Sequence, residues 1–238
     1  MPRSVAVNVG ANTTLPGFRA PVHPDGRFEY VPIPEREPAA VSLPTYADLN
    51  VEMDVPPDVR DTEVHLDPEF AEYPQCEAYT YGDDYAVKAG PLSDLAAGDY
   101  AFFYATLSTA GDPPTWAAPE WGAYLIGAFR LDRDPVTAYE SLDPADRERF
   151  ANNAHVKRET VDAEVLLLGD PAESRLFDRA IPLSSRTAGA DPNRIVIDLS
   201  ADSGKGPWWR RPLRFDEPAT SALVDIVETG EIERCFEN

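Results

Sequence analysis

Two long apolar segments, separated by a loop rich in proline and glycine, constrain the fold of this chain more than any other feature. Residues 100–107 are almost continuously apolar and aromatic, and residues 121–130 are apolar with two glycines. Continuous runs of such residues are typical of strands that are buried on both faces. Glycines inside a strand favour a bulge or a bend. We therefore expect the two segments to form a hairpin in the centre of a curved sheet.

Shorter patterns predict further strands. Residues 4–10 alternate β-forming side chains and stop at a glycine, as a core strand does. Strands are also predicted over 78–84, 163–168 and 194–199. Residues 27–34 alternate as well, but two prolines confine this segment to a sheet edge or force it out of the sheet.

Helix-start signals occur at three places. Asp143 and Asp170 each stand before a proline, which places a capping residue directly ahead of the first helical position. The third signal is Glu217–Pro218, where an apolar face continues until Gly230. Helices are therefore predicted over 144–152, over 171–180 and from 217 to 230.

The length and apolar content are those of a chain with one substantial core. With 238 residues, of which 43% are hydrophobic, the chain is long enough to bury a large apolar surface. No internal repeat or linker divides it, so one domain over 1–238 is expected. Within it we predict a proline-rich surface excursion at 35–60 and a C-terminal extension with a helix at 200–238.

The charge pattern indicates adaptation to high salt. The formal charge is −21, the acidic residues are spread along the whole chain, and lysine is nearly absent. Distributed self-repulsion of this size is screened at high ionic strength. Against this background the cationic exceptions stand out, and they are residues 155–158 and 205–214.

The cysteine content and the hydropathy point to an intracellular protein. Cys76 and Cys235 match no metal-binding spacing and are expected to be free, buried thiols. The sequence shows no signal-peptide pattern and no apolar run of about 20 residues that could span a membrane. We expect a cytoplasmic location and no membrane partner.

Two histidines and two carboxylates are candidates for catalysis: His155, His65, Asp67 and Asp83. A histidine can transfer protons near neutral pH, and an adjacent carboxylate can orient it. His155 is the strongest candidate because polar and cationic residues surround it in the sequence. The alternative is that these groups are buried structural residues with satisfied hydrogen bonds.

Amide, hydroxyl and guanidinium groups are candidates for substrate or nucleotide binding: Asn8, Asn12, Asn153, Arg158, Ser174 and Arg175. The last two follow a predicted helix start, where backbone N–H groups favour anions. The glycines near Asn8 fit neither the dinucleotide nor the phosphate-loop pattern. We predict no metal site, because the adjacent acids Asp83 and Asp84 are unremarkable in so acidic a chain, and no particular cofactor is indicated.

The segment 205–214 combines cations with indole rings, which suits phosphates and stacked bases. The candidate nucleic-acid contacts are Lys205, Trp208, Trp209, Arg210, Arg211 and Arg214. The alternative is that the tryptophans pack this segment onto the core while the arginines pair with carboxylates.

Several short segments together resemble a known family, the third type of nucleotide-modification-associated domain, which is linked to DNA modification. The most specific block joins residues 7–13 to 24–35. Shorter pieces lie at 65–70, 80–83, 98–104, 153–155 and 169–177. The resemblance implies a role in DNA modification without implying a reaction.

A looser similarity concerns the turn at Gly98–Asp99 and the two long strands up to Arg130, whose order resembles PUA-like and EVE-like base-binding barrels. Together these features predict an α+β fold, either a curved mixed β-sheet or a partly closed PUA-like barrel, with three or more short helices.

Three functions follow as expectations. The first is a protein that recognises or helps install a modified nucleobase through a polar pocket, with DNA or a nucleotide and other DNA-modification proteins as partners. The second is an enzyme acting on a free nucleotide or sugar-nucleotide precursor. The third is a non-catalytic structural or interaction subunit. The zinc signature of base deaminases is absent from the sequence.

Overall fold

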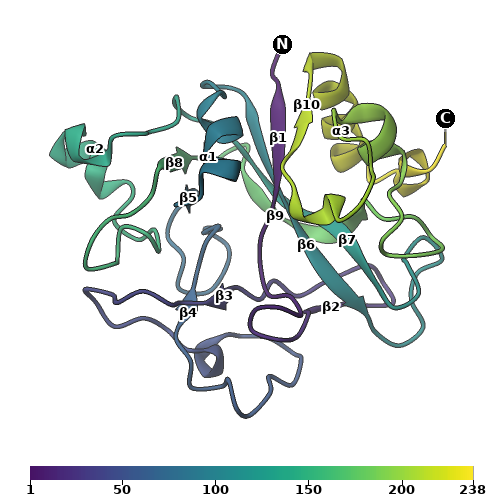
Figure 1. Cartoon of the computed structure of the whole chain (residues 1–238), viewed down its shortest axis with the longest axis horizontal. Coiled ribbons are helices and arrows are strands. Elements are labelled where there is room, and N and C mark those ends of the chain that lie inside the picture. Colours follow the sequence, from purple (N-terminus) through teal and green to yellow (C-terminus); the bar gives the residue numbers. More distant parts are fainter. Residues whose placement is uncertain (238) are drawn as a thin grey trace.

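A mixed β-sheet forms the centre of the molecule (Figure 1) in the computed structural model, which describes residues 1–237. Its strands lie in the order β10-β1-β6-β7-β9, and β2 pairs with β6 beside that path. Strands β1 and β2 run parallel to β6, whereas the other neighbours are antiparallel. The strands are β1 (Ser4–Asn8), β2 (Pro21–Val22), β6 (Tyr100–Thr109), β7 (Trp121–Arg130), β9 (Arg175–Pro182) and β10 (Leu213–Phe215).

The predicted central hairpin is confirmed by the pairing of β6 with β7. Its register shifts between Phe103 and Tyr104, and the pairing of β7 with β9 shifts between Leu125 and Gly127, so the hairpin carries the expected irregularity near a glycine. Phe103 packs into one hydrophobic cluster and Tyr104 into another, because successive side chains point to opposite faces. Burial on both faces explains why the segment is continuously apolar.

Two small antiparallel sheets stand beside the central one. Strand β3 (Ile33–Pro34) pairs with β4 (Val64–His65), and β5 (Thr80–Asp83) pairs with β8 (Val165–Leu168). The strands predicted over 78–84 and 163–168 are therefore confirmed. The prolines of the 27–34 segment leave only a two-residue strand outside the central sheet.

The regular helices are α1 (Ala86–Ser93), α2 (Pro144–Glu148) and α3 (Glu217–Thr229). Helix α3 has the predicted boundaries, because the Asp216 side chain accepts a hydrogen bond from the Ala219 N–H and Gly230 ends the helix at a φ of 66°. Helix α2 begins at the predicted cap but is shorter than expected. Short helical turns lie at Tyr46–Asp48, Tyr139–Ser141, Ile195–Leu199, Trp208–Arg210 and Ile232–Cys235.

Two predicted elements were wrong. The segment 171–180 contains most of strand β9 instead of a helix. The Asp170 side chain accepts from the Ala172 N–H in a tight turn, and pairing with β7 then overrides the local cap pattern. The segment 194–199 is a turn of π-helix instead of a strand, and it begins where the Asn193 side chain accepts from the Ile195 N–H.

The described part of the chain has an α+β fold with an open sheet. Within residues 1–237 the outer strands β9 and β10 do not pair with each other, so no closed barrel forms. The proline-rich segment 35–60 places Tyr46, Leu49 and Val55 in the core.

Both cysteines are free, and burial raises the pKa of each thiol to about 12. None of the helices described has the length and apolarity needed to cross a membrane.

Candidate functional site

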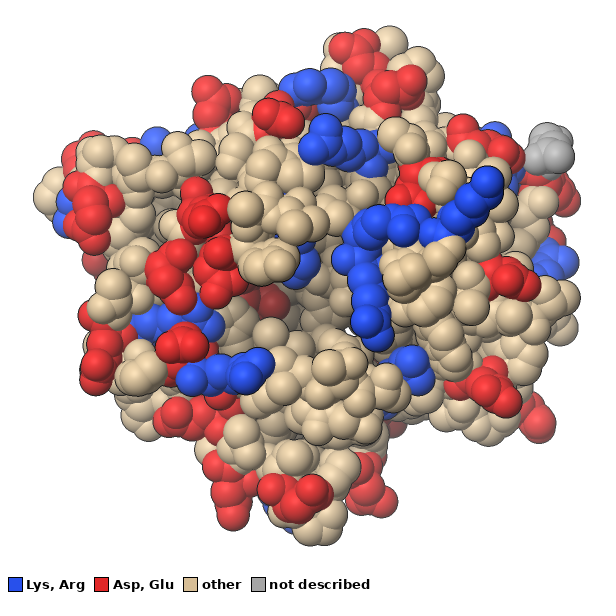
Figure 2. Space-filling model, in the orientation of Figure 1, with Lys and Arg blue, Asp and Glu red and all other residues tan. Residues whose placement is uncertain are grey.

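A hollow near the centre of one face leads into a cavity of about 370 Å³ (Figure 2). Red carboxylate side chains gather on its left side in this view, and blue cationic side chains follow its right side (Figure 2). The cavity is lined from strands β1, β3, β4 and β5, from helix α1 and from the loop before β8. Seven of the predicted site residues line it: Asn8, Asn12, His65, Asp67, Asp83, His155 and Arg158.

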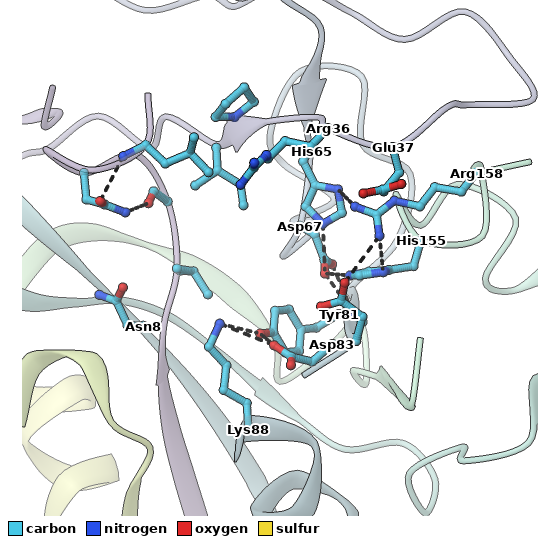
Figure 3. A pocket seen from close by; sticks show the side chains of 18 residues that line it. Asn8, Arg36, Glu37, His65, Asp67, Tyr81, Asp83, Lys88, His155 and Arg158 are labelled. Carbon is cyan, nitrogen blue, oxygen red and sulfur yellow. Dashed lines mark hydrogen bonds and ion pairs between the residues drawn. The ribbon is translucent and has the colours of Figure 1, made fainter. Parts of the chain in front are cut away.

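Asp67 lies at the buried end of this cavity (Figure 3), with 2% of its side chain exposed. Its two oxygens accept hydrogen bonds from the Gly82 N–H at 3.2 and 2.9 Å, and Oδ1 also accepts from Asn153 Nδ2 at 3.1 Å. Asn153, another predicted residue, therefore acts from behind the cavity. Burial raises the pKa of Asp67 well above that of an ordinary carboxyl group.

The two histidines approach the same carboxylate oxygen (Figure 3). His155 Nε2 lies 3.6 Å and His65 Nε2 3.9 Å from Asp67 Oδ2. The two rings meet edge to face, with centroids 4.8 Å apart and an angle of 90°. Both distances to Oδ2 are longer than a hydrogen bond. The two Nε2 atoms therefore lie close to Oδ2 without a hydrogen bond to it.

Carboxylates on the opposite ring nitrogens fix both imidazoles. Nδ1 of His65 lies 2.6 Å from Glu35 Oε2, and Nδ1 of His155 lies 2.8 Å from Asp162 Oδ1. The Arg158 guanidinium lies farther from the same nitrogens, at 3.3 Å from His65 Nδ1 and 3.1 Å from His155 Nδ1. With the closer carboxylate as its partner each Nδ1 donates, because an ionised carboxylate can only accept, and this leaves Nε2 with a free lone pair in the neutral ring. Burial, followed by the neighbouring His65, lowers the pKa of His155 and favours that neutral form.

The absence of a side chain at position 82 makes room for the His155 ring. A Cβ at Gly82 would lie 2.6 Å from His155 Cδ2 and 3.1 Å from Leu166 Cδ2. Gly82 thus supplies both the N–H that holds Asp67 and the space that His155 occupies. Local sequence patterns do not indicate this contact, because the two residues belong to distant segments.

Two cations are held among the acidic groups of the cavity. Arg158 lies 2.8 Å from Glu35 and 2.5 Å from Asp162, so it bridges the carboxylates that orient the two histidines. Although burial opposes ionisation of Glu35, the hydrogen bond from His65 and the contact with Arg158 lower its pKa. Lys88 of α1 lies 3.3 Å from Asp83 Oδ2.

Four residues of this network were missed by sequence reasoning: Glu35, Tyr81, Lys88 and Asp162. The Tyr81 hydroxyl donates to Asp83 Oδ2 at 2.6 Å. Glu35 ends the most specific block of the family resemblance, and Asp162 stands four residues after Arg158, which is the spacing of a helical ion pair. Tyr81 lies in another segment of that resemblance, residues 80–83. None of these signals indicates a histidine partner.

Two groups of side chains have the spacing of metal ligands. The ligating atoms of His65, Asp67 and His155 all lie within 4.8 Å of one another, as do those of Asp84, His155 and Asp162. In the second group the Arg158 guanidinium already lies 3.8 Å from Asp84 and 2.5 Å from Asp162. Only the first group offers imidazole nitrogens and a carboxylate with no cation between them.

A second cavity, of about 280 Å³, adjoins the first through Asn8, Asn12 and Leu15, which line both. It is lined by Arg19, Trp209 and Arg210, among others. Two of the predicted nucleic-acid contacts, Trp209 and Arg210, therefore lie next to the histidine cavity.

The other residues of the 205–214 segment lie elsewhere. Trp208 is 0% exposed and donates its indole N–H to the Ala190 carbonyl, so the expectation that its ring stacks on a base was wrong. Arg211 forms a bidentate pair with Asp202 at 2.7 and 2.8 Å. Lys205 and Arg214 are exposed and line neither cavity among the described residues.

Ser174 and Arg175 also lie outside the histidine cavity. In place of the helix whose N-terminus was expected to bind an anion there is the turn before β9, and the N–H groups of Ala172, Glu173 and Ser174 all donate to Asp170. The Ser174 side chain is buried, while Arg175 is exposed and lies near the Phe177 ring. The expected anion site is therefore not formed.

Comparison with known proteins identifies the family. The family model described as nucleotide modification associated domain 3 matches residues 3–225, nearly the whole chain. No curated protein and no solved structure matches. The resemblance predicted from short sequence segments is thus confirmed, and this chain belongs to the nucleotide modification associated domain 3 family.

Proposed function

We propose that this protein recognises, or helps to install, a modified nucleobase in a nucleic-acid strand. One observation carries the proposal: the histidine cavity continues through Asn8 and Asn12 into a hollow that carries an indole ring and two arginines. In this arrangement the base enters the first cavity, and the adjoining strand lies along the second.

The first cavity has the size and the chemistry for a base. Its volume of about 370 Å³ falls within the range of small-ligand sites. The Asn8 amide makes only a long contact, of 3.4 Å, with the Tyr104 carbonyl, so it remains available to a base edge. The Asn12 side chain is engaged in its own loop, where it accepts from the Thr14 N–H at 2.9 Å. Base recognition by Asn8 is therefore the stronger assignment.

The reacting groups lie deeper. His155 and His65 line the cavity within reach of a bound ligand, and each is oriented by a carboxylate. Asp67 and Asp83 are both buried, and Asp83 holds Tyr81 and Lys88 in place. We assign proton transfer to the two histidines and anion contact to Arg158. Glu35 and Asp162 orient the imidazoles, whereas Asp67 lies beyond hydrogen-bond distance of both Nε2 atoms.

The second cavity has the chemistry for a strand. Arg210 is exposed, and Trp209 is half-buried with its ring edge to face on Trp121 at 5.3 Å. The Arg19 guanidinium lies 4.4 Å from the centroid of the same Trp121 ring. An indole beside arginines suits a base stacked next to its phosphate. Such a cationic surface is unusual in a chain with a net charge of −21.

Fluorescence anisotropy with a labelled single-stranded DNA and with a free nucleotide tests the proposal. Trp209→Ala should weaken DNA binding by a factor of about ten, since base stacking is worth about 1–3 kcal/mol. Arg210→Ala should also weaken it and reduce its salt dependence. Both variants should bind the free nucleotide as the wild type does.

Arg214→Ala is the matched control, because it removes the same charge from an exposed position outside both cavities. It should leave DNA binding unchanged. If Arg210→Ala and Arg214→Ala behave alike, or if DNA binding is absent while the free nucleotide binds, the strand assignment is wrong. The second outcome would favour an enzyme acting on a free nucleotide or sugar-nucleotide precursor.

A further inference from the structure

We infer that His65, Asp67 and His155 bind a divalent first-row transition-metal ion at the floor of the first cavity. The ligands are Nε2 of each histidine and Oδ2 of Asp67. This inference rests on the arrangement of these side chains and is independent of whether the cavity receives a nucleic acid.

The three atoms are spaced as ligands of one ion. Bonds of about 2.0–2.2 Å at angles between octahedral and tetrahedral separate neighbouring ligand atoms by about 2.8–3.6 Å. The observed separations from Asp67 Oδ2 are 3.6 Å to His155 and 3.9 Å to His65. All three ligand atoms lie within 4.8 Å of one another, so inward movement of the side chains would bring them onto one ion. The distances to Asp67 Oδ2 are too long for hydrogen bonds, which would require a closer approach.

The groups behind the ligands hold them in the ligating orientation. Each histidine that binds a metal through one nitrogen commonly donates its other N–H to a carboxylate. Glu35 and Asp162 fill that role for His65 and His155, at 2.6 and 2.8 Å. Asn153 holds Oδ1 of Asp67 at 3.1 Å, which leaves Oδ2 directed at the histidines.

The charges of the network call for a further cation. Counted as ionised, its acidic and basic side chains other than the histidines comprise five carboxylates and two cations, which leaves a surplus of three negative charges: Glu35, Asp67, Asp83, Asp84 and Asp162 against Lys88 and Arg158. Neither cation lies between the histidines and Asp67 Oδ2. A buried carboxylate such as Asp67 is stable in its ionised form only beside a positive charge, and a divalent ion would supply it.

The donor set selects the class of metal. Two imidazole nitrogens and one carboxylate oxygen suit Zn²⁺, Fe²⁺, Co²⁺ or Ni²⁺, whereas Mg²⁺ and Ca²⁺ prefer oxygen ligands throughout. Three protein ligands leave at least one coordination position open. Because all three residues line the cavity, that position faces the bound ligand. The sequence alone predicted no metal site here.

Titration of chelator-treated protein with Co²⁺ tests the inference through visible absorption and calorimetry. We expect about one Co²⁺ per chain and no band from a cysteine ligand. Asp67→Asn and His155→Gln should abolish this binding. His23→Gln is the matched control, since His23 is the remaining histidine of the chain and lies beside Glu29, at 3.3 Å, outside the cluster. It should bind Co²⁺ as the wild type does.

Glu35→Gln should weaken Co²⁺ binding by a factor of about 10–100 while preserving the stoichiometry, because Glu35 acts only by orienting His65. Should the cavity variants fail to fold, the wild-type protein still decides the matter: Co²⁺ must shift the imidazole NMR signals of His65 and His155 and leave those of His23 unchanged. Absence of stoichiometric binding, equal shifts of all three histidines, or unaltered binding by folded Asp67→Asn would overturn the inference. DNA binding is measured separately, so either proposal can fail alone.

Discussion

Replacing Gly82 by alanine tests the packing of the His155 ring against strand β5. The new Cβ would lie 2.6 Å from His155 Cδ2 and 3.1 Å from Cγ of the same ring. Carbon atoms in contact are ordinarily about 3.5–4.0 Å apart, so the ring must move by about 1 Å. The Gly82 N–H, which donates to Asp67 at 2.9 Å, is retained in the variant. The substitution therefore displaces the imidazole while keeping the hydrogen bond that holds the carboxylate.

We expect Gly82→Ala to lower the free energy of unfolding by about 1–3 kcal/mol, the usual cost of overpacking a core. Metal–ligand distances tolerate about 0.2 Å, so a shift of this size should also abolish stoichiometric Co²⁺ binding. Urea denaturation measures the first effect and visible titration the second. Gly90→Ala is the control, because the residue is inside α1 and, apart from its neighbours in that helix, nothing among the described residues lies within 4 Å of its added Cβ. That variant should bind Co²⁺ as the wild type does. Its stability should change by no more than about 1 kcal/mol, because the gain in helix propensity is opposed by contact of the new Cβ with the ring of Pro91.

A double variant identifies the origin of the cost. Adding His155→Ala to Gly82→Ala removes the ring with which the new Cβ clashes. The loss of unfolding free energy in the double variant should therefore be smaller than the sum of the losses in the two single variants. Wild-type stability and Co²⁺ binding in Gly82→Ala would refute the packing argument. Strict additivity of the two substitutions would place the clash with Leu166 instead of His155.

Two further predictions concern the ion pairs of Arg158 with Glu35 and of Arg211 with Asp202. Arg158→Met should destabilise the protein by about 3 kcal/mol in urea denaturation, because it leaves the Glu35 carboxylate, 2% exposed, without its guanidinium partner. Although burial opposes it, the hydrogen bond from Arg211 lowers the pKa of Asp202 below its ordinary value of 3.8. A carboxyl group whose pKa is lowered by folding stabilises the folded protein at pH values above its ordinary, unfolded-state pKa. This stabilisation is lost as the pH falls through the folded-state pKa. The melting temperatures of wild type and Asp202→Asn should therefore converge as the pH drops below about 4, and a constant difference would contradict the pairing.

Local sequence patterns determined the strands of the central hairpin and helix α3. The hairpin strands are buried on both faces, so their apolar character is continuous and needs no knowledge of their neighbours. Helix α3 is bounded by Asp216 and Gly230, whose effects are confined to a single turn. The local sequence pattern failed at 171–180, because a capping residue such as Asp170 is compatible with a turn as well as with a helix. Pairing with β7 decides between the two.

In the candidate site, too, one part could be predicted from the sequence and another part could not. Its chemical groups could be chosen from the sequence because few residues in this chain are histidines or stand out from the acidic background, and His65, Asp67 and His155 were among them. Their convergence could not be predicted. It depends on Gly82 making room for His155 and on Glu35 and Asp162 turning the two rings, contacts that join distant segments. Composition and local periodicity carry no information about which distant side chains meet, and packing of the tertiary structure alone directs two imidazoles at one carboxylate oxygen.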